Sequence, residues 1–106
     1  KNIQNFIFVV GIQNDKDITT MLKTISPLVS TIIFTKSKNE KASNPKELLK
    51  IFNKINRNKS IKTKLIENSK KALNYAKKIV DKNGLVVVAG AIYLVGGVVW
   101  LSSYII

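Results

Sequence analysis

The stretch from Gly84 to Ile106 decides the fold of this chain, and it reads Gly-Leu-Val-Val-Val-Ala-Gly-Ala-Ile-Tyr-Leu-Val-Gly-Gly-Val-Val-Trp-Leu-Ser-Ser-Tyr-Ile-Ile. It carries no charge, and about 20 apolar residues suffice to cross a bilayer, so a membrane span is one interpretation. Residues 85–88 are mostly β-branched, which is typical of a strand buried on both faces, and Gly90 then marks a turn into a helix. We favour the buried strand and helix, because glycines and serines interrupt the apolar run.

The composition limits the chemistry that this chain can perform. Its 106 residues suffice for one domain with a single core, and 45% of them are apolar, as in globular proteins. The chain has neither cysteine nor histidine, which excludes thiolate chemistry and removes the commonest general base and metal ligand. A metal site would have to be built from the six acidic side chains, and we predict none.

The net charge of +12 suits an anionic partner such as nucleic acid or an anionic surface. The lysines are scattered over every segment, however, and the few aromatic residues are not interleaved with them in a stacking pattern. We therefore expect no nucleic-acid ligand. A basic module that binds nucleic acid or an anionic surface is the alternative function.

Apolar runs at residues 6–10 and 31–35 predict two buried strands. Between them, apolar residues at helical spacing predict a helix whose buried face comprises Ile18, Met21, Leu22 and Ile25. We expect Asn14 or Asp15 to cap this helix and Asp17 to lie in its first turn.

Two further helices are expected before the decisive stretch. Asn44 as N-cap, Pro45 at the first position and Glu47 at the third predict a helix with the apolar face Leu48, Leu49, Phe52 and Ile55. Ile61 would lie in a short edge strand. The third helix, closed by a glycine or asparagine near Gly84, would have the face Leu65, Ser69, Ala72, Leu73, Ala76, Ile79 and Val80.

The alternation of strands and helices predicts an α/β fold with a mainly parallel sheet and helices on both faces. Ligands of such sheets bind beyond the carboxyl ends of the strands, where three loops gather Asp15, Lys16, Asp17, Thr35, Lys36, Lys41, Gly90 and Tyr93. This cluster could position a phosphate or an amino-acid substrate. Alternatively, the aspartates are helix caps and the lysines are solvated.

Motifs for a complete active site are absent from the sequence. No G-x-x-x-x-G-K-[ST] loop is present to bind the phosphates of ATP, and no G-x-G-x-x-G follows a strand. Without histidine or cysteine, no set of nucleophile, base and orienting residue can be assembled. We therefore expect that this chain is not a complete enzyme by itself.

Several motifs follow one another in a fixed order along the chain. They are Val10-Gly11-Ile12-Gln13-Asn14-Asp15-Lys16-Asp17-Ile18, Ile33-Phe34-Thr35, Glu40-Lys41-Ala42, Asn44-Pro45-Lys46-Glu47-Leu48 and Gly90-Ala91-Ile92-Tyr93-Leu94-Val95-Gly96. In order and spacing they resemble the C-terminal domain of folylpolyglutamate and dihydrofolate synthases, which belong to the Mur ligase superfamily. The resemblance extends from about Phe6 to Gly96.

The resemblance implies that residues 1–106 form one Rossmann-like C-terminal domain of an ATP-dependent ligase. Such enzymes use ATP and Mg²⁺ to convert a carboxylate into an acyl phosphate, which the amino group of glutamate attacks. The substrate would be folate or dihydropteroate, and ATP and Mg²⁺ would be bound mainly by an N-terminal ATPase domain. This chain would then be a fragment of a cytoplasmic enzyme, inactive alone, and we expect no membrane contact.

The same resemblance implies which residues help to position nucleotide and substrate, namely Asp15, Lys16, Asp17, Thr35, Lys41, Gly90, Ala91 and Tyr93. Two of them depart from the family pattern. Ala91 replaces a serine and lacks its hydroxyl, and Lys41 replaces an arginine and loses its bidentate geometry. The sequence after Gly96 is apolar where the family usually turns polar, so this tail needs a partner surface or a membrane.

Overall fold

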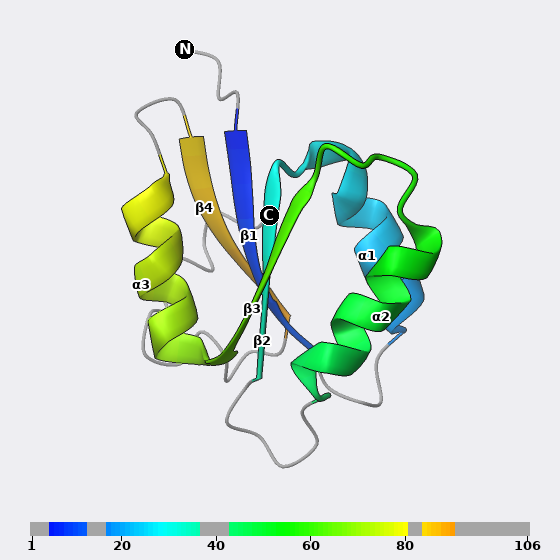
Figure 1. The fold of residues 1–106 in the computed structure, drawn as a ribbon, viewed down its shortest axis with the longest axis horizontal. Helices are drawn as coiled ribbons and strands as arrows, with labels where there is room; N and C mark the ends of the chain where they lie inside the picture. Colours follow the sequence, from blue (N-terminus) through cyan, green and yellow to red (C-terminus); the bar gives the residue numbers. More distant parts are fainter. Residues whose placement is uncertain (1–4, 13–16, 37–42, 81–83, 91–106) are drawn as a thin grey trace.

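The computed structural model describes residues 5–12, 17–36, 43–80 and 84–90. Its strands form one parallel sheet in the order β3-β2-β1-β4 (Figure 1), with β1 (Asn5–Gly11), β2 (Thr31–Lys36), β3 (Lys62–Asn68) and β4 (Gly84–Gly90). The connecting helices are α1 (Ile18–Ile25), α2 (Pro45–Ile55) and α3 (Ser69–Ile79), and a short 3-10 turn, η1 (Ser26–Leu28), follows α1. The predicted α/β fold with a parallel sheet is confirmed.

Helices cover both faces of the sheet, as predicted. The chain moves outward from β1 to β2 and β3 through α1 and α2, and then returns across the sheet to β4 through α3. Because crossovers between parallel strands are right-handed, the change of direction places α3 on the face opposite α1 and α2 (Figure 1).

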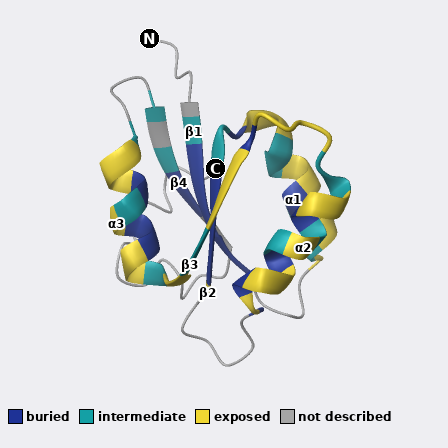
Figure 2. Cartoon of the chain, viewed as in Figure 1, coloured by how far each residue is buried: buried dark blue, intermediate teal, exposed yellow. Residues whose placement is uncertain are grey.

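The side chains of the central strands alternate between two cores. On the side of α1 and α2 the core includes Phe8, Val10, Ile32, Phe34, Leu22, Leu48 and Phe52. On the side of α3 it includes Ile7, Val9, Ile33, Val88, Ala72, Leu73 and Ala76. Strands covered on both faces need continuous apolar runs, which explains the sequence of β1 and β2 and their burial in Figure 2.

The strand predicted at the start of the decisive stretch is confirmed. β4 pairs with β1 over its full length, from Gly84 beside Asn5 to Gly90 beside Gly11. Its Val87 and Val88 are buried in the two opposite cores. A single membrane helix from Gly84 onward is therefore wrong, whereas the helix predicted after Gly90 lies outside the described residues. Within the described part of the chain, no helix is long and apolar enough to cross a bilayer.

The start of α1 corrects one predicted cap. Asp17 is the N-cap itself, since its side chain accepts a hydrogen bond from the backbone N–H of Thr20. It therefore does not lie in the first turn, and the cap is neither Asn14 nor Asp15. The start of α2 agrees with the prediction, because Asn44 is the N-cap and accepts from the N–H of Lys46 at 2.9 Å.

The third helix is shorter than predicted at both ends. Leu65 belongs to β3, a full edge strand that pairs with β2, and α3 begins only after its N-cap Asn68. The helix ends at Ile79 with Val80 as C-cap, and Gly84 opens β4 instead of closing the helix. Backbone pairing with β2 overrides the helical spacing of Leu65, since Leu65 lies opposite Phe34 in the sheet.

Candidate functional site at the carboxyl edge of the sheet

The carboxyl ends of all four strands meet at one edge of the sheet, at the lower end of Figure 1. Gly11 at the end of β1 lies beside Gly90 at the end of β4, and Lys36 at the end of β2 pairs with Asn68 of β3. The structure therefore brings Thr35, Lys36 and Gly90 to the edge at which parallel sheets bind ligands. Whether they contact a ligand stays a prediction.

Other predicted site residues lie outside the described part of the chain. These are Asp15, Lys16, Lys41, Ala91 and Tyr93. Their proposed roles remain predictions, and so does the effect of the two departures from the family pattern.

Thr35 is fully buried, and its hydroxyl is directed to the protein itself. The Thr35 Oγ1 donates a hydrogen bond to the carbonyl oxygen of Glu67 at 3.0 Å. The pairing of β2 and β3 shifts register between Phe34 and Lys36, so the ladder is interrupted at this point. The Thr35 hydroxyl supplies the Glu67 carbonyl with a hydrogen-bond donor next to this irregularity. The single hydroxyl proton of Thr35 is therefore not available to a substrate.

The carboxylate of Asp17 is likewise committed to its own helix. Its oxygens accept from the backbone N–H of Thr20 at 3.2 Å and from the Thr20 hydroxyl at 2.7 Å. The hydrogen bond from the Thr20 side chain, followed by that from its N–H, lowers the pKa of Asp17, and the charge of Lys23 adds a smaller effect. A cap with a lowered pKa is a poor general base at neutral pH.

The structure adds two polar residues at this edge that the sequence interpretation missed. The Ser43 N–H donates to the carbonyl of Ile12 at 2.8 Å, and Ser43 is buried, so the start of α2 is tied to the end of β1. The side chain of Asn68 accepts from the N–H of Lys71 at 2.9 Å and caps α3 where β3 ends. Asparagine is a preferred N-cap, and this preference could have revealed the start of α3.

The edge is electrostatically suited to an anion. α1, α2 and α3 each begin after a strand that ends here, so their N-termini, with their partial positive charge, face this edge. Lys36 adds a formal positive charge and is exposed. By contrast, no group of three or more acidic, histidine or cysteine residues that could hold a metal ion exists in the described ranges.

Comparison with known protein families shows to which family the chain belongs. The family described as dihydrofolate synthetase, C-terminal domain, matches residues 1–101. The chain therefore belongs to the C-terminal domains of the folylpolyglutamate and dihydrofolate synthases, of the Mur ligase family, and the resemblance inferred from the sequence motifs is confirmed. A search of curated proteins gave no match.

Solved structures share the fold at low sequence identity. Folylpolyglutamate synthase from Mycobacterium tuberculosis, complexed with ADP, superposes with a TM-score of 0.76 and 16% identity, over 95% of this chain and 24% of that one. FolC from E. coli, in complex with DHPP and ADP, gives a TM-score of 0.77 and 18% identity over 94% of this chain and 22% of that one. The bifunctional folylpolyglutamate synthase/dihydrofolate synthase from Yersinia pestis, complexed with AMPPNP and a Mn ion, gives a TM-score of 0.76 and 20% identity, over 89% of this chain and 21% of that one. This chain thus spans less than a quarter of these proteins.

Proposed function

We propose that this chain is the C-terminal domain of an ATP-dependent ligase that adds L-glutamate to folate or dihydropteroate in the cytoplasm. The family match over residues 1–101 carries this proposal. The chain corresponds to less than a quarter of the related structures and contains no P-loop, so the complete ligase would need an N-terminal ATPase domain. By itself, the 106-residue chain is expected to be inactive.

The role of this domain would be to position anionic groups. The described edge offers Lys36 and the N-termini of α2 and α3, which suit a phosphate or the carboxylates of glutamate, whereas the N-terminus of α1 already holds the Asp17 carboxylate. As the family resemblance implies, Mg²⁺ would be held mainly by the N-terminal domain. ATP would supply the phosphoryl group that activates the substrate carboxylate, and Lys36 would help to orient the anionic partner at the edge.

The decisive experiment uses the complete protein encoded by the reading frame that contains this chain. ADP release should require both a pterin substrate, either folate or dihydropteroate, and glutamate. Reactions lacking one substrate are the controls, and the dependence on folate or on dihydropteroate identifies the acceptor. An intact frame that releases no ADP with either acceptor would leave the fold assignment standing and would refute the activity.

A single substitution tests the positioning role within that enzyme. Lys36→Gln should lower kcat/KM for glutamate or ATP by roughly 10- to 150-fold, since a lost hydrogen bond to a charged group costs about 1.5–3 kcal/mol. Lys59→Gln is the matched control, because Lys59 is an exposed lysine in the loop before β3, at the amino end of the sheet. Equal kinetics for the two variants would exclude Lys36 from the site.

A further inference from the structure

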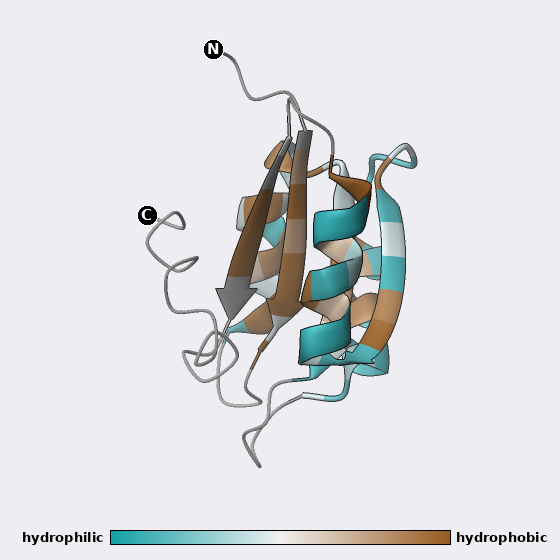
Figure 3. Cartoon of the chain, turned by 90° about the vertical axis from the view of Figure 1, so that its left-hand side faces the viewer, coloured by the Kyte–Doolittle hydropathy of each residue, from teal (hydrophilic) through white to brown (hydrophobic). Residues whose placement is uncertain are grey.

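The pairing of β2 and β3 changes register directly before the carboxyl edge of the sheet. Phe34 lies opposite Leu65. Two residues further along β2, Lys36 lies opposite Asn68, which is three residues beyond Leu65. One extra residue of β3 is therefore accommodated as a bulge opposite Thr35. Bulges are common in edge strands, and β3 is an edge strand of the described sheet, with mixed colours in Figure 3 where β1 is hydrophobic.

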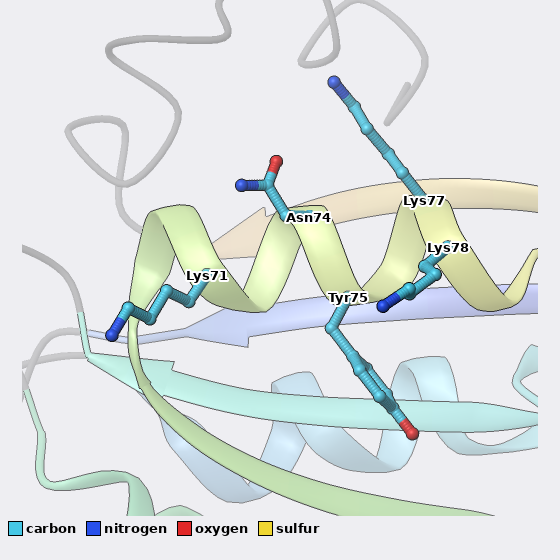
Figure 4. A pocket seen from close by; sticks show the side chains of 5 residues that line it. All are labelled: Lys71, Asn74, Tyr75, Lys77 and Lys78. Carbon is cyan, nitrogen blue, oxygen red and sulfur yellow. The ribbon is translucent and has the colours of Figure 1, made fainter.

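Hydrogen bonds hold this bulge at both of its ends. Toward β2, the hydroxyl of the fully buried Thr35 donates to the carbonyl oxygen of Glu67 at 3.0 Å. Toward α3, the side chain of Asn68 accepts from the N–H of Lys71 at 2.9 Å, and Figure 4 shows Lys71 at the end of α3 that follows β3. Glu67 and Asn68 are therefore fixed between Thr35 and the first turn of α3.

The register shift decides which residue lies opposite Lys36. If the pairing of Phe34 with Leu65 continued without a bulge, Lys36 would lie opposite Glu67. Residues directly opposite each other have Cβ atoms about 4.5–5.5 Å apart, and opposite charges at such positions attract each other. An ion pair with Glu67 would engage the ammonium group that a ligand needs.

The observed register keeps these two charges apart. Lys36 lies opposite the neutral Asn68, and within the described ranges neither Lys36 nor Glu67 has an ion-pair partner. Lys36 is exposed at the edge where parallel sheets bind ligands. The bulge therefore has a consequence for the candidate site, since it leaves the charge of Lys36 unpaired.

We propose that Thr35 is a positioning residue that acts through Lys36. Its hydroxyl holds the bulge, the bulge keeps Glu67 out of register with Lys36, and the ammonium group of Lys36 stays available to a phosphate or carboxylate at the carboxyl edge. Bulges next to active sites commonly re-aim a side chain in this way. The inference rests on the proposed ligase function, in which Lys36 orients an anionic partner.

Steady-state kinetics of ADP release by the complete enzyme test this inference. Thr35→Val keeps the shape of the side chain but removes the donor to the Glu67 carbonyl, and it should lower kcat/KM for glutamate or ATP about fivefold. Thr35→Ser keeps the hydroxyl and should stay within about twofold of the wild type. The double variant Thr35→Val, Glu67→Gln should recover most of the loss, because no carboxylate is then left to pair with Lys36.

The matched control for lost stability is Ile32→Val, which removes one buried methyl group earlier in β2 and should change kcat/KM less than about twofold. A Thr35→Val variant with wild-type kinetics would overturn the inference. So would a loss that Glu67→Gln does not restore, because Thr35 would then act on stability alone. If Lys36→Gln is impaired and Thr35→Val is not, only this inference fails. An enzyme that releases no ADP refutes the proposed function, and this inference falls with it.

Discussion

Two of the polar candidates, Thr35 and Asp17, direct their hydrogen bonds to the backbone or side chains of neighbouring residues. Thr35 is fully buried and joins β2 to β3 through the carbonyl of Glu67, and Asp17 binds Thr20 at the start of α1. Both residues lie where a ligand would be expected, but their polar atoms already have partners. They shape the edge of the sheet, whereas Lys36 is exposed and can reach an anion.

The Thr35 hydroxyl is expected to contribute to stability. Thr35→Val keeps the shape of the side chain but leaves the Glu67 carbonyl without its donor, which should lower the free energy of unfolding by about 1–2 kcal/mol. Urea unfolding monitored by circular dichroism measures this change. Thr35→Ser retains the hydroxyl and should recover part of the loss; a Thr35→Val variant as stable as the wild type would show that the hydrogen bond contributes nothing.

The Asp17 cap should make stability depend on pH. The pKa of Asp17 is lowered in the folded state, so its contribution is fully present above the unfolded pKa of about 3.9 and is lost as pH falls through the lower folded value. Asp17→Asn keeps an acceptor oxygen but no charge. We expect the wild type to have the higher Tm at pH 7, and the difference to shrink in thermal scans as pH falls below the unfolded pKa of about 3.9. A difference unchanged across this range would contradict the assignment.

At the scale of elements, the distance of α3 from the sheet depends on two alanines. Ala72 and Ala76 are fully buried against the central strands, whereas α2 buries Phe52 and Leu48 against the other face. The Phe52 ring contacts the Phe34 ring with centroids 5.8 Å apart. The two faces of the sheet are thus packed differently, by small side chains under α3 and by large ones under α2.

Enlarging the contact under α3 should therefore be costly. Ala76→Leu inserts a larger side chain into a close-packed core and should destabilise the fold by about 1–3 kcal/mol. Asn74→Leu makes a comparable change on the exposed side of the same helix and should stay within about 0.5 kcal/mol. Chemical denaturation of both variants checks the expectation, which equal stabilities would refute.

At the scale of the whole molecule, one sheet separates two cores but belongs to both. The residues of β1 alternate between them, with Phe8 on one side and Val9 on the other, so neither core can form without the same strand. A small domain built in this way is expected to unfold cooperatively.

This expectation distinguishes one folding unit from two. Phe52→Leu on one side and Ala76→Leu on the other should each shift the whole unfolding transition to lower denaturant and create no second transition. Far-UV circular dichroism and resolved NMR signals from each core measure the two sides separately. Non-coincident transitions would show that the two cores unfold independently.

Much of this architecture was determined locally by the sequence. Continuous apolar runs at residues 6–10 and 31–35 determined the buried strands, and Asn44 with Pro45 determined the start of α2, because these patterns depend on neighbouring residues alone. The strand at residues 84–90 and the gathering of Thr35, Lys36 and Gly90 at one edge follow from the parallel alternation of strands and helices.

Tertiary structure decided what local patterns could not. Leu65 has the spacing of a helical face, but pairing with β2 places it in a strand, since long-range backbone hydrogen bonds outweigh weak local propensity. The commitment of Thr35 to Glu67, 32 residues further along the chain, depends on the register of two strands. The contact of Lys64 with Tyr75, in which the Lys64 Nζ lies 5.2 Å from the centre of the ring, likewise arises only when β3 and α3 are brought together.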